Sequence, residues 1–295
     1  PTDTDPMPIP HDDLGGPGPT LHFSHPNAYT PRSFGQFLAP LTAHYHVLAA
    51  HHRPLWYLAG GAAERPEAVI DWTWDALADD LLRFLDEQGL AQVIGVGHSL
   101  GAVATMIAAR KQPQRFRALA LIEPVFLPPA ILQLARANPQ AAAEQPFVLA
   151  ARRRRDRWPS RADAFARFRQ KSVFAGWADA TLWEYVNHGL HDDPATGEVA
   201  LSFPREWEAW IYSRPPTNVW DELPGLAVPT LAVRAAQSDT LYPDAWALWQ
   251  QLQPAATFVE LEGVGHMLTA EAPEVVAGVV LGWLGEQLGS GSVGQ

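Results

Sequence analysis

Residues 93–113 read VIGVGHSLGAVATMIAARKQP, and this stretch decides the fold. Its first residues are mostly β-branched and predict a buried strand, whereas the alanine-rich part after Ser99 predicts a helix that packs closely on a sheet. Ser99 therefore stands in a strand-to-helix turn between Gly97 and Gly101. Side chains at those two positions would collide with neighbouring backbone, so the turn requires glycine. It projects the serine hydroxyl above the sheet, where the helix N-terminus directs free amide groups. The alternative is a glycine-rich turn that binds phosphate or has no ligand.

The composition limits the classes of protein to which the chain can belong. It has 295 residues, of which 47% are hydrophobic and 18% charged, as in ordinary globular proteins. The formal net charge of −11 argues against a nucleic-acid partner, since such binding needs a basic surface. The absence of cysteine excludes disulfides, thiolate catalysis and thiolate zinc sites.

No apolar run is long enough for stable membrane insertion and no signal peptide is visible, so we expect a cytoplasmic protein. Because the chain begins at Pro1, secretion with a trimmed leader stays open.

Short apolar strands alternate with helical patterns along much of the chain. The helical patterns lie at 74–90, 100–111 and 272–288, and the strands at 20–25, 46–51, 92–98, 118–125, 229–236 and 256–263. This alternation predicts an α/β fold with a doubly wound, mostly parallel sheet of six to seven strands.

The alternation stops between 127 and 222, a segment without convincing strands that predicts several short helices. We interpret 127–222 as a helical cap inserted into a core formed by 20–126 and 223–288. Open parallel sheets bind ligands at the carboxyl ends of their strands, so a cap there would roof a pocket. Residues 1–19 are predicted to be an extended lead-in and 289–295 a flexible tail.

Serine becomes a nucleophile only when a base removes its proton. His266, in LEGVGHML, follows the last predicted strand and precedes the final helix, so it lies at the same edge of the sheet as Ser99. An acid must then orient the imidazole. Asp239, in VRAAQSDTLYP, follows the strand 229–236 and is our choice. Glu123, in LIEPV at the end of the preceding strand, is the rival acid, and Asp244 is a weaker candidate.

Three motifs in this order carry a resemblance to a known family: GHSLG at 97–101, SDTLYP at 238–243 and GVGHM at 263–267. Over about residues 20–288 the chain resembles the α/β-hydrolase superfamily, specifically its cap-bearing serine hydrolases of esterase or lipase type. The order Ser99, Asp239, His266 is the order of that family's catalytic triad. The sequence departs from the family at Ala235, where glycine often precedes the acid loop.

The resemblance also implies an oxyanion hole made of two backbone N–H groups. One belongs to Leu100, the residue after the nucleophile, and the other to Asn27 in His25-Pro26-Asn27, which matches the family's loop after an early strand. Pro26 stands where the family usually has glycine, and proline has no N–H, but Asn27 keeps its own amide.

The predicted function is hydrolysis of a carboxylic ester of a small, apolar substrate through an acyl-enzyme, without a metal or a cofactor. The same triad could act on a lactone, an amide, a carbon–carbon bond or a peroxide. The aspartate nucleophile of related dehalogenases and epoxide hydrolases is not matched, because position 99 is serine. A receptor that binds a small molecule with little turnover is the alternative from another class.

Three further features have simpler explanations. The basic segment 151–169 is expected to be a solvated helix face paired with acids. The aromatic residues of the cap are expected to be mostly core. Two stretches carry histidines at spacings that resemble metal sites, and structural or polar roles are favoured for them: His44, His46, His51 and His52, and His188, His191, Asp192 and Asp193.

Overall fold

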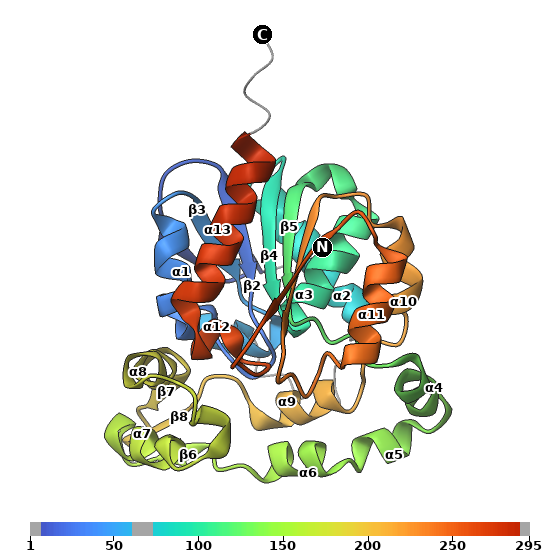
Figure 1. Ribbon diagram of the computed structural model, residues 1–295. Helices are drawn as coiled ribbons and strands as arrows, with labels where there is room; N and C mark the ends of the chain where they lie inside the picture. The colour runs from blue at the N-terminus through green and yellow to red at the C-terminus, as the bar shows by residue number, and fades with distance from the viewer. Residues whose placement is uncertain (1–6, 61–72, 290–295) are drawn as a thin grey trace, which may run out of the picture.

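The computed structural model describes residues 7–60 and 73–289. Its centre is a seven-stranded sheet in the order β1-β3-β2-β4-β5-β9-β10 (Figure 1). All neighbouring strands are parallel except β1, which is antiparallel to β3. The strands are β1 His11–Gly15, β2 Thr20–Ser24, β3 His46–Ala50, β4 Val93–His98, β5 Phe116–Ile122, β9 Thr230–Ala235 and β10 Thr257–Leu261. The predicted fold class and sheet are therefore confirmed.

All six strands predicted from apolar runs are present, and β1 is the seventh. The segment 1–19, predicted as an extended lead-in, contributes this strand at His11–Gly15, while residues 1–6 lie outside the described residues. This strand has the sequence HDDLG and runs along the edge of the sheet, so it lacks the apolar run that marks the buried strands. Its partner is fixed by backbone pairing, with His11 opposite Ala50 and Asp13 opposite Leu48.

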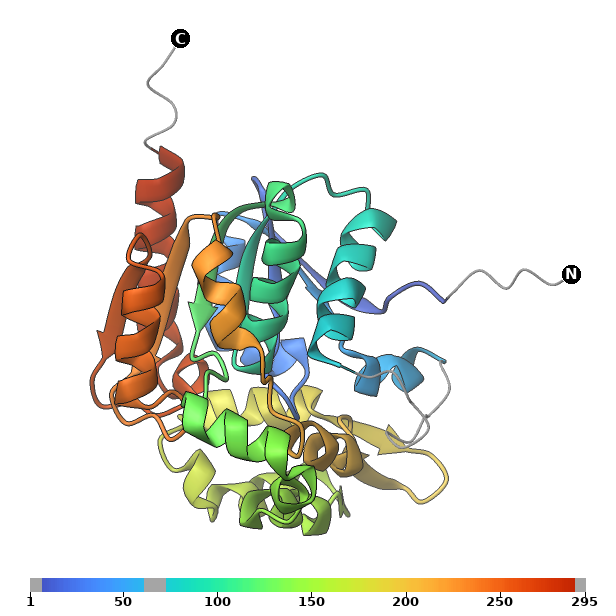
Figure 2. The same ribbon diagram turned by 90° about the vertical axis from the view of Figure 1, so that its right-hand side faces the viewer.

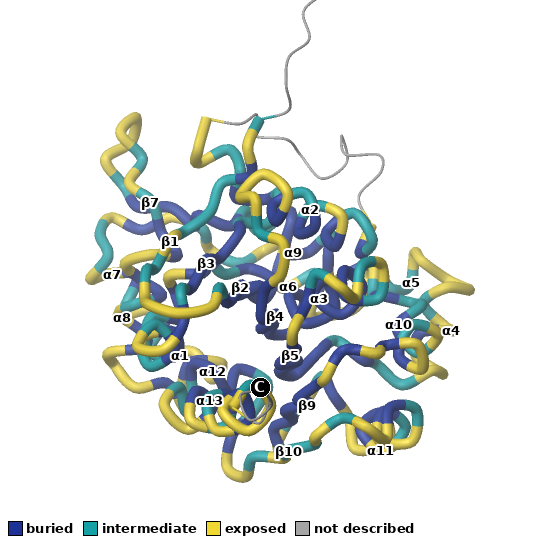
Figure 3. Tube along the Cα trace, turned by 90° about the horizontal axis from the view of Figure 1, so that it is seen from above, coloured by how far each residue is buried: buried dark blue, intermediate teal, exposed yellow. Residues whose placement is uncertain are grey.

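Helices cover both faces of the sheet (Figure 3). One face carries α2 (Trp74–Glu87), α3 (Leu100–Lys111) and α11 (Pro243–Leu252), and the other carries α1 (Gly35–Thr42) and α13 (Pro273–Gly289). α2 begins where the Thr73 side chain accepts a hydrogen bond from the Ala76 N–H, and it buries its leucine stripe against α3. The three helices predicted from the sequence are confirmed. Outside the cap, the described chain also has the short helices η1 Pro31–Phe34, η2 Arg53–Ala59, η4 Pro113–Arg115, η6 Leu223–Gly225 and α12 Leu268–Glu271.

Residues 127–222, which we call the cap, connect β5 to β9 and lie beyond the carboxyl ends of the strands (Figures 1 and 2). Their elements are α4 Pro129–Ala137, α5 Pro139–Ala143, α6 Pro146–Arg153, β6 Arg157–Trp158, α7 Arg161–Arg169, η5 Ser172–Phe174, α8 Asp179–His188, β7 Leu190–Asp193, β8 Glu198–Leu201, α9 Arg205–Tyr212 and α10 Val219–Glu222. Beside the predicted short helices, β6, β8 and β7 form a small antiparallel sheet that the sequence analysis did not predict. These strands have two to four residues, too few for a periodic pattern. The boundaries of the cap stay a prediction.

The basic segment 151–169 is paired with acids of the cap, as expected. Arg154 bonds to Glu208, while the other ion pairs are Arg157–Asp193, Arg161–Asp192 and Arg169–Asp179. Two of the acids whose spacing resembled a metal site, Asp192 and Asp193, are therefore engaged by arginines. Over residues 7–60 and 73–289, no helix combines the length and hydropathy that crossing a bilayer requires.

Candidate active site

Ser99 lies in the sharp turn between β4 and α3, with φ +56° and ψ −117°. A positive φ is strained for a serine, and such strain persists only where the surroundings enforce it. On both sides of Ser99 the backbone of a neighbouring element comes so close to the chain that only glycine fits. A Cβ on Gly97 would lie 2.5 Å from the Gly101 oxygen, and a Cβ on Gly101 would lie 2.0 Å from the Ser24 oxygen. Both glycines are thus required by the close packing of β2, β4 and α3.

Replacing Gly101 by alanine is expected to lower the free energy of unfolding by about 3 kcal/mol or more, since the new methyl group meets backbone that cannot move away. Urea unfolding measures this change. The matched control is Gly278→Ala in α13, where a Cβ meets nothing within 4 Å. Alanine there should stabilise the helix by up to about 1 kcal/mol. A Gly101→Ala protein as stable as the wild type would contradict the packing described for the turn.

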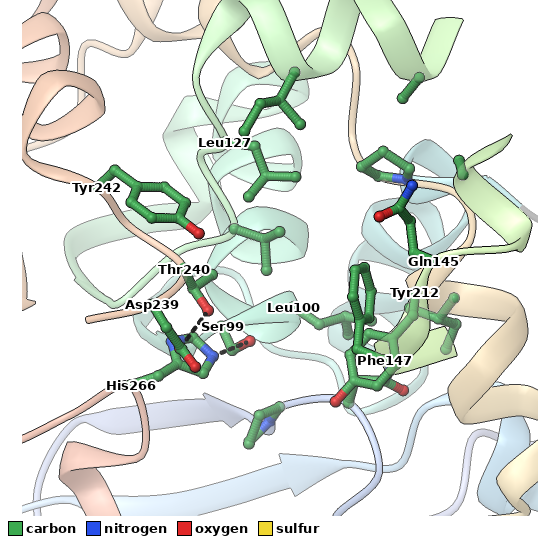
Figure 4. A pocket seen from close by; sticks show the side chains of 18 of the residues that line it. Ser99, Leu100, Leu127, Gln145, Phe147, Tyr212, Asp239, Thr240, Tyr242 and His266 are labelled. Carbon is green, nitrogen blue, oxygen red and sulfur yellow. Dashed lines mark hydrogen bonds between the residues drawn. The ribbon is translucent and has the colours of Figure 1, made fainter. Parts of the chain in front are cut away.

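The Ser99 hydroxyl and the His266 imidazole meet at this turn. Ser99 Oγ lies 3.0 Å from His266 Nε2, and the backbone N–H of Ser99 donates to the Ile122 oxygen over 3.0 Å. His266 follows β10 and precedes α12, so the two residues come from strands separated by β5 and β9 in the sheet. The sequence-based expectation that this histidine lies over Ser99 agrees with the geometry (Figure 4).

The acid that contacts the imidazole is Glu123, directly after β5. His266 Nδ1 donates to Glu123 Oε2 over 2.9 Å, and Glu123 is fully buried. The carboxylate also accepts hydrogen bonds from the Ala235 N–H and the Ser238 hydroxyl, each over 2.6 Å. These three donors compensate for burying a negative charge and fix the orientation of the carboxylate.

The choice of Asp239 as the acid partner of the histidine is corrected by this geometry. Ser238, one residue earlier, directs its hydroxyl to Glu123 and accepts the N–H groups of Thr240 and Leu241. Because the serine takes the inward position, Asp239 is exposed, and its recorded hydrogen bond is with the Thr240 hydroxyl at 3.3 Å. Glu123, the rival acid of the sequence analysis, occupies the place assigned to Asp239. Asp244 lies exposed in the first turn of α11.

His98 supports the loop that carries His266, and the sequence analysis did not single it out. Its Nε2 donates to the His266 carbonyl oxygen over 2.9 Å, and its Nδ1 accepts from the Thr269 hydroxyl over 2.9 Å. Burial lowers the pKa of His98 to about 3, so its ring is neutral near neutral pH and one nitrogen can accept. His98, the residue before Ser99, thereby connects the β4 turn to the loop after β10.

The loop after β2 carries the predicted donor Asn27 and is held by two histidines. His25 Nδ1 donates to the Pro26 oxygen over 2.9 Å, while His52 Nε2 donates to the His25 oxygen over 3.0 Å. Burial, with the neighbouring His52, holds the pKa of His25 well below its ordinary value. The Asn27 side-chain amide donates to the backbone carbonyl oxygen of Glu208 in α9 over 3.2 Å, and this bond connects the loop to the cap.

Asn27 and Leu100 both lie beside Ser99 on the wall of the same cavity, and both are buried. In the described part of the chain, neither backbone N–H has a recorded hydrogen-bond acceptor. Leu100 begins α3, and the first amides of a helix have no partner within it. The structure thus brings the two predicted donors to the cavity that contains Ser99.

The cavity lies between the carboxyl edge of the sheet and the cap and has a volume of about 730 Å³. Ser99 and His266 are at its base, with apolar side chains from the β5–α4 loop and α4, among them Leu127, Ile131 and Leu134. Of the aromatic cap residues, Tyr212 and Phe147 line it, whereas Trp177, Tyr185 and Trp207 are core, as expected for most of them. Its volume and apolar lining are typical of small-molecule sites. Within the described ranges, no group of three His, Cys, Asp or Glu side chains is placed to hold a metal ion.

Comparison with known protein families identifies the family of the chain. The model of the alpha/beta hydrolase fold matches residues 15–273. The chain belongs to the α/β-hydrolase fold family. The resemblance carried by the three motifs is thereby confirmed at the level of the family.

This α/β hydrolase is also similar to individual proteins at low identity. It is 28% identical to lipase LipV of Mycobacterium tuberculosis over 249 residues, which are 80% of this chain and 86% of the lipase. It is 24% identical to bifunctional epoxide hydrolase 2 of Mus musculus over 260 residues, which are 79% of this chain and 46% of that enzyme. The match to the Sus scrofa enzyme of the same name, 30% identical over 83 residues and 27% of this chain, covers 15% of that protein. The α/β hydrolase therefore spans half or less of the epoxide hydrolases that it matches.

The fold is shared with solved esterase structures. A thermophilic esterase from Thermogutta terrifontis superposes with a TM-score of 0.65 at 20% identity, over 95% of this chain and 93% of the esterase. Likeness at this identity shows the fold, so the chemistry has to be argued from the residues of the α/β hydrolase itself.

Proposed function

We propose that this α/β hydrolase is a serine hydrolase that cleaves carboxylic esters through an acyl-enzyme. The observation that carries the proposal is the hydrogen-bonded series Ser99, His266, Glu123 at the base of an apolar cavity. Serine, histidine and acid in this series are the arrangement that activates a hydroxyl for attack on a carbonyl. The esterase-like and lipase-like relatives agree with this class of reaction.

The first half of the reaction transfers the acyl group to the enzyme. Ser99 Oγ attacks the ester carbonyl carbon while His266 Nε2 takes the hydroxyl proton, and the carbonyl electron pair moves to oxygen. The amides of Leu100 and Asn27 are placed to bind that oxyanion, and one such donor is typically worth about 10²–10³ in rate. Collapse of the intermediate breaks the bond to the alcohol, which leaves with the proton held by His266.

The second half releases the acid. His266 takes a proton from water, the hydroxide attacks the acyl carbon, and Ser99 recovers its proton as the bond to Oγ breaks. Glu123 acts through the histidine in both halves. Its carboxylate holds Nδ1–H in place and stabilises the imidazolium, and its three hydrogen bonds fix the orientation of the carboxylate.

Pre-steady-state hydrolysis of 4-nitrophenyl butyrate tests the proposal. Because nitrophenol leaves before the acyl group, we expect a burst of about one nitrophenol per folded chain, followed by slower turnover, provided that deacylation is slower than acylation. Single-turnover reactions with enzyme in excess replace the burst where acylation is the slower step. Absence of hydrolysis of a series of aryl esters by the folded protein would overturn the proposal.

A further inference from the structure

The cavity wall carries a carboxylate that the proposed reaction does not use. Asp239 is the one carboxylate among the residues that line the cavity in the described part of the chain, and no lysine or arginine lines it. The other lining residues are apolar, or are polar without a carboxylate or a basic group of lysine or arginine. A charged substrate group in the cavity would therefore meet the carboxylate of Asp239 on the wall.

The loop after β9 fixes the place of this carboxylate. The Ser238 hydroxyl accepts the N–H groups of Thr240 and Leu241, and the buried Arg234 Nε donates to the Leu241 oxygen over 2.7 Å. These bonds hold the backbone on both sides of Asp239. Its side chain is exposed, and none of the ion pairs recorded over the described residues involves it. The carboxylate is thus held by the loop and stays available to a ligand.

Aromatic side chains stand near the carboxylate on the cavity walls. Figure 4 shows Asp239, Thr240 and Tyr242 on one side of Ser99, with Tyr212 and Phe147 across the cavity. Tyr242 and Tyr212 are 39% and 38% exposed, so parts of their surfaces are open to a ligand. A carboxylate in a cavity whose walls also carry aromatic rings is a combination that recognises alkylammonium groups.

We propose that Asp239 selects substrates by charge, so that this cavity favours esters that carry an ammonium group and disfavours esters that carry a carboxylate. The proposal rests on the proposed ester hydrolysis and gives it a substrate class. Two opposite charges about 6 Å apart, at an effective permittivity between about 40 and 80, change relative kcat/KM by about three- to tenfold. The preference weakens at high salt because the carboxylate is accessible to solvent.

Matched thioesters test the charge selection. Acetylthiocholine carries a quaternary ammonium, 3,3-dimethylbutyl thioacetate is its neutral isostere, and 3-(acetylthio)propanoate carries a carboxylate. We expect the wild type to prefer the cationic ester to the neutral one by about three- to tenfold in kcat/KM and to disfavour the anionic one by a similar factor. Asp239→Asn should remove both differences, so that the three thioesters are hydrolysed with similar kcat/KM. The control is Asp244→Asn, an exposed carboxylate in α11 that does not line the cavity and should keep the wild-type pattern.

A pattern of relative rates that Asp239→Asn leaves unchanged would overturn the charge selection while leaving the hydrolase in place. Loss of the neutral reaction in that variant would overturn it too, since Asp239 would then act in the chemistry. If the folded protein hydrolyses neither these thioesters nor the aryl esters, the proposed function fails, and a binding measurement then tests the charge selection by itself. Phenyltrimethylammonium should then bind the wild type about three- to tenfold more tightly than Asp239→Asn in calorimetry, and equal binding would contradict the inference.

Discussion

Ser99→Ala is expected to lower kcat for 4-nitrophenyl butyrate by about 10⁵–10⁶, because the proposed route through an acyl-enzyme ends when the nucleophile is removed. The variant keeps the small side chain that the turn between β4 and α3 allows, and the backbone N–H of residue 99 still donates to the Ile122 oxygen. The cavity and the oxyanion donors are unchanged. Binding of a substrate or product should therefore survive while turnover is lost.

Steady-state rates and a binding measurement on the same preparation separate these effects. The control is Thr240→Ala, a second hydroxyl residue on the cavity wall that has no bond to His266 among those described. It should keep kcat within a few-fold of the wild type. Undiminished hydrolysis by Ser99→Ala would remove Ser99 from the mechanism, and a Thr240→Ala variant that loses turnover instead would place the nucleophile elsewhere.

Glu123→Gln is expected to lower kcat by about 10³–10⁴, which is close to the effect of the matching substitution in a serine protease triad. The amide has nearly the shape of the carboxylate, and its oxygen can still accept the Ala235 N–H. Its nitrogen, however, cannot accept from His266 Nδ1–H or from the Ser238 hydroxyl, so the imidazole turns or takes the wrong tautomer. Glu123→Gln is expected to lower the free energy of unfolding by less than it raises the activation free energy of the reaction.

Asp239→Asn supplies the comparison, since it makes the same chemical change at the acid that the sequence favoured. With an uncharged ester, its kcat should stay within about twofold of the wild type, because the hydrogen bond to His266 is made by Glu123. Rates of both variants are measured beside their urea unfolding. The reverse result, a large loss in Asp239→Asn with Glu123→Gln active, would mean that the histidine takes its partner from the β9 loop during turnover.

The sheet could be predicted from the sequence because its buried strands are apolar on both faces. β4 and β5 are almost wholly buried, and their apolar runs are the pattern of strands that are covered on both faces. The edge strand β1, with the sequence HDDLG, has no such pattern, and its place comes from backbone pairing with β3. The small sheet of the cap was missed for a related reason, since its strands have two to four residues, too few to show a periodic pattern.

The places of Ser99 and His266 at one edge of the sheet could be predicted for a physical reason. The glycines beside Ser99 are required by backbone approaches of 2.0–2.5 Å, and a parallel sheet brings the ends of β4 and β10 to one edge. The acid could not be chosen this way, because β5 and β9 both end at that edge with an acid nearby. The choice depends on Ser238, whose hydroxyl turns inward to Glu123 and leaves Asp239 on the cavity wall. Such a difference of one position within a loop is not visible in strand and helix patterns.

Peptide mass spectrometry of the quenched burst reaction identifies the residue that carries the acyl group. A folded sample mixed with 4-nitrophenyl butyrate is quenched in acid during the burst, digested and sequenced. The account predicts one butyryl group per chain on the peptide that contains GHSLG, attached to Ser99, and no such group in Ser99→Ala. Hydrolysis that proceeds with the butyryl group on another residue would contradict it.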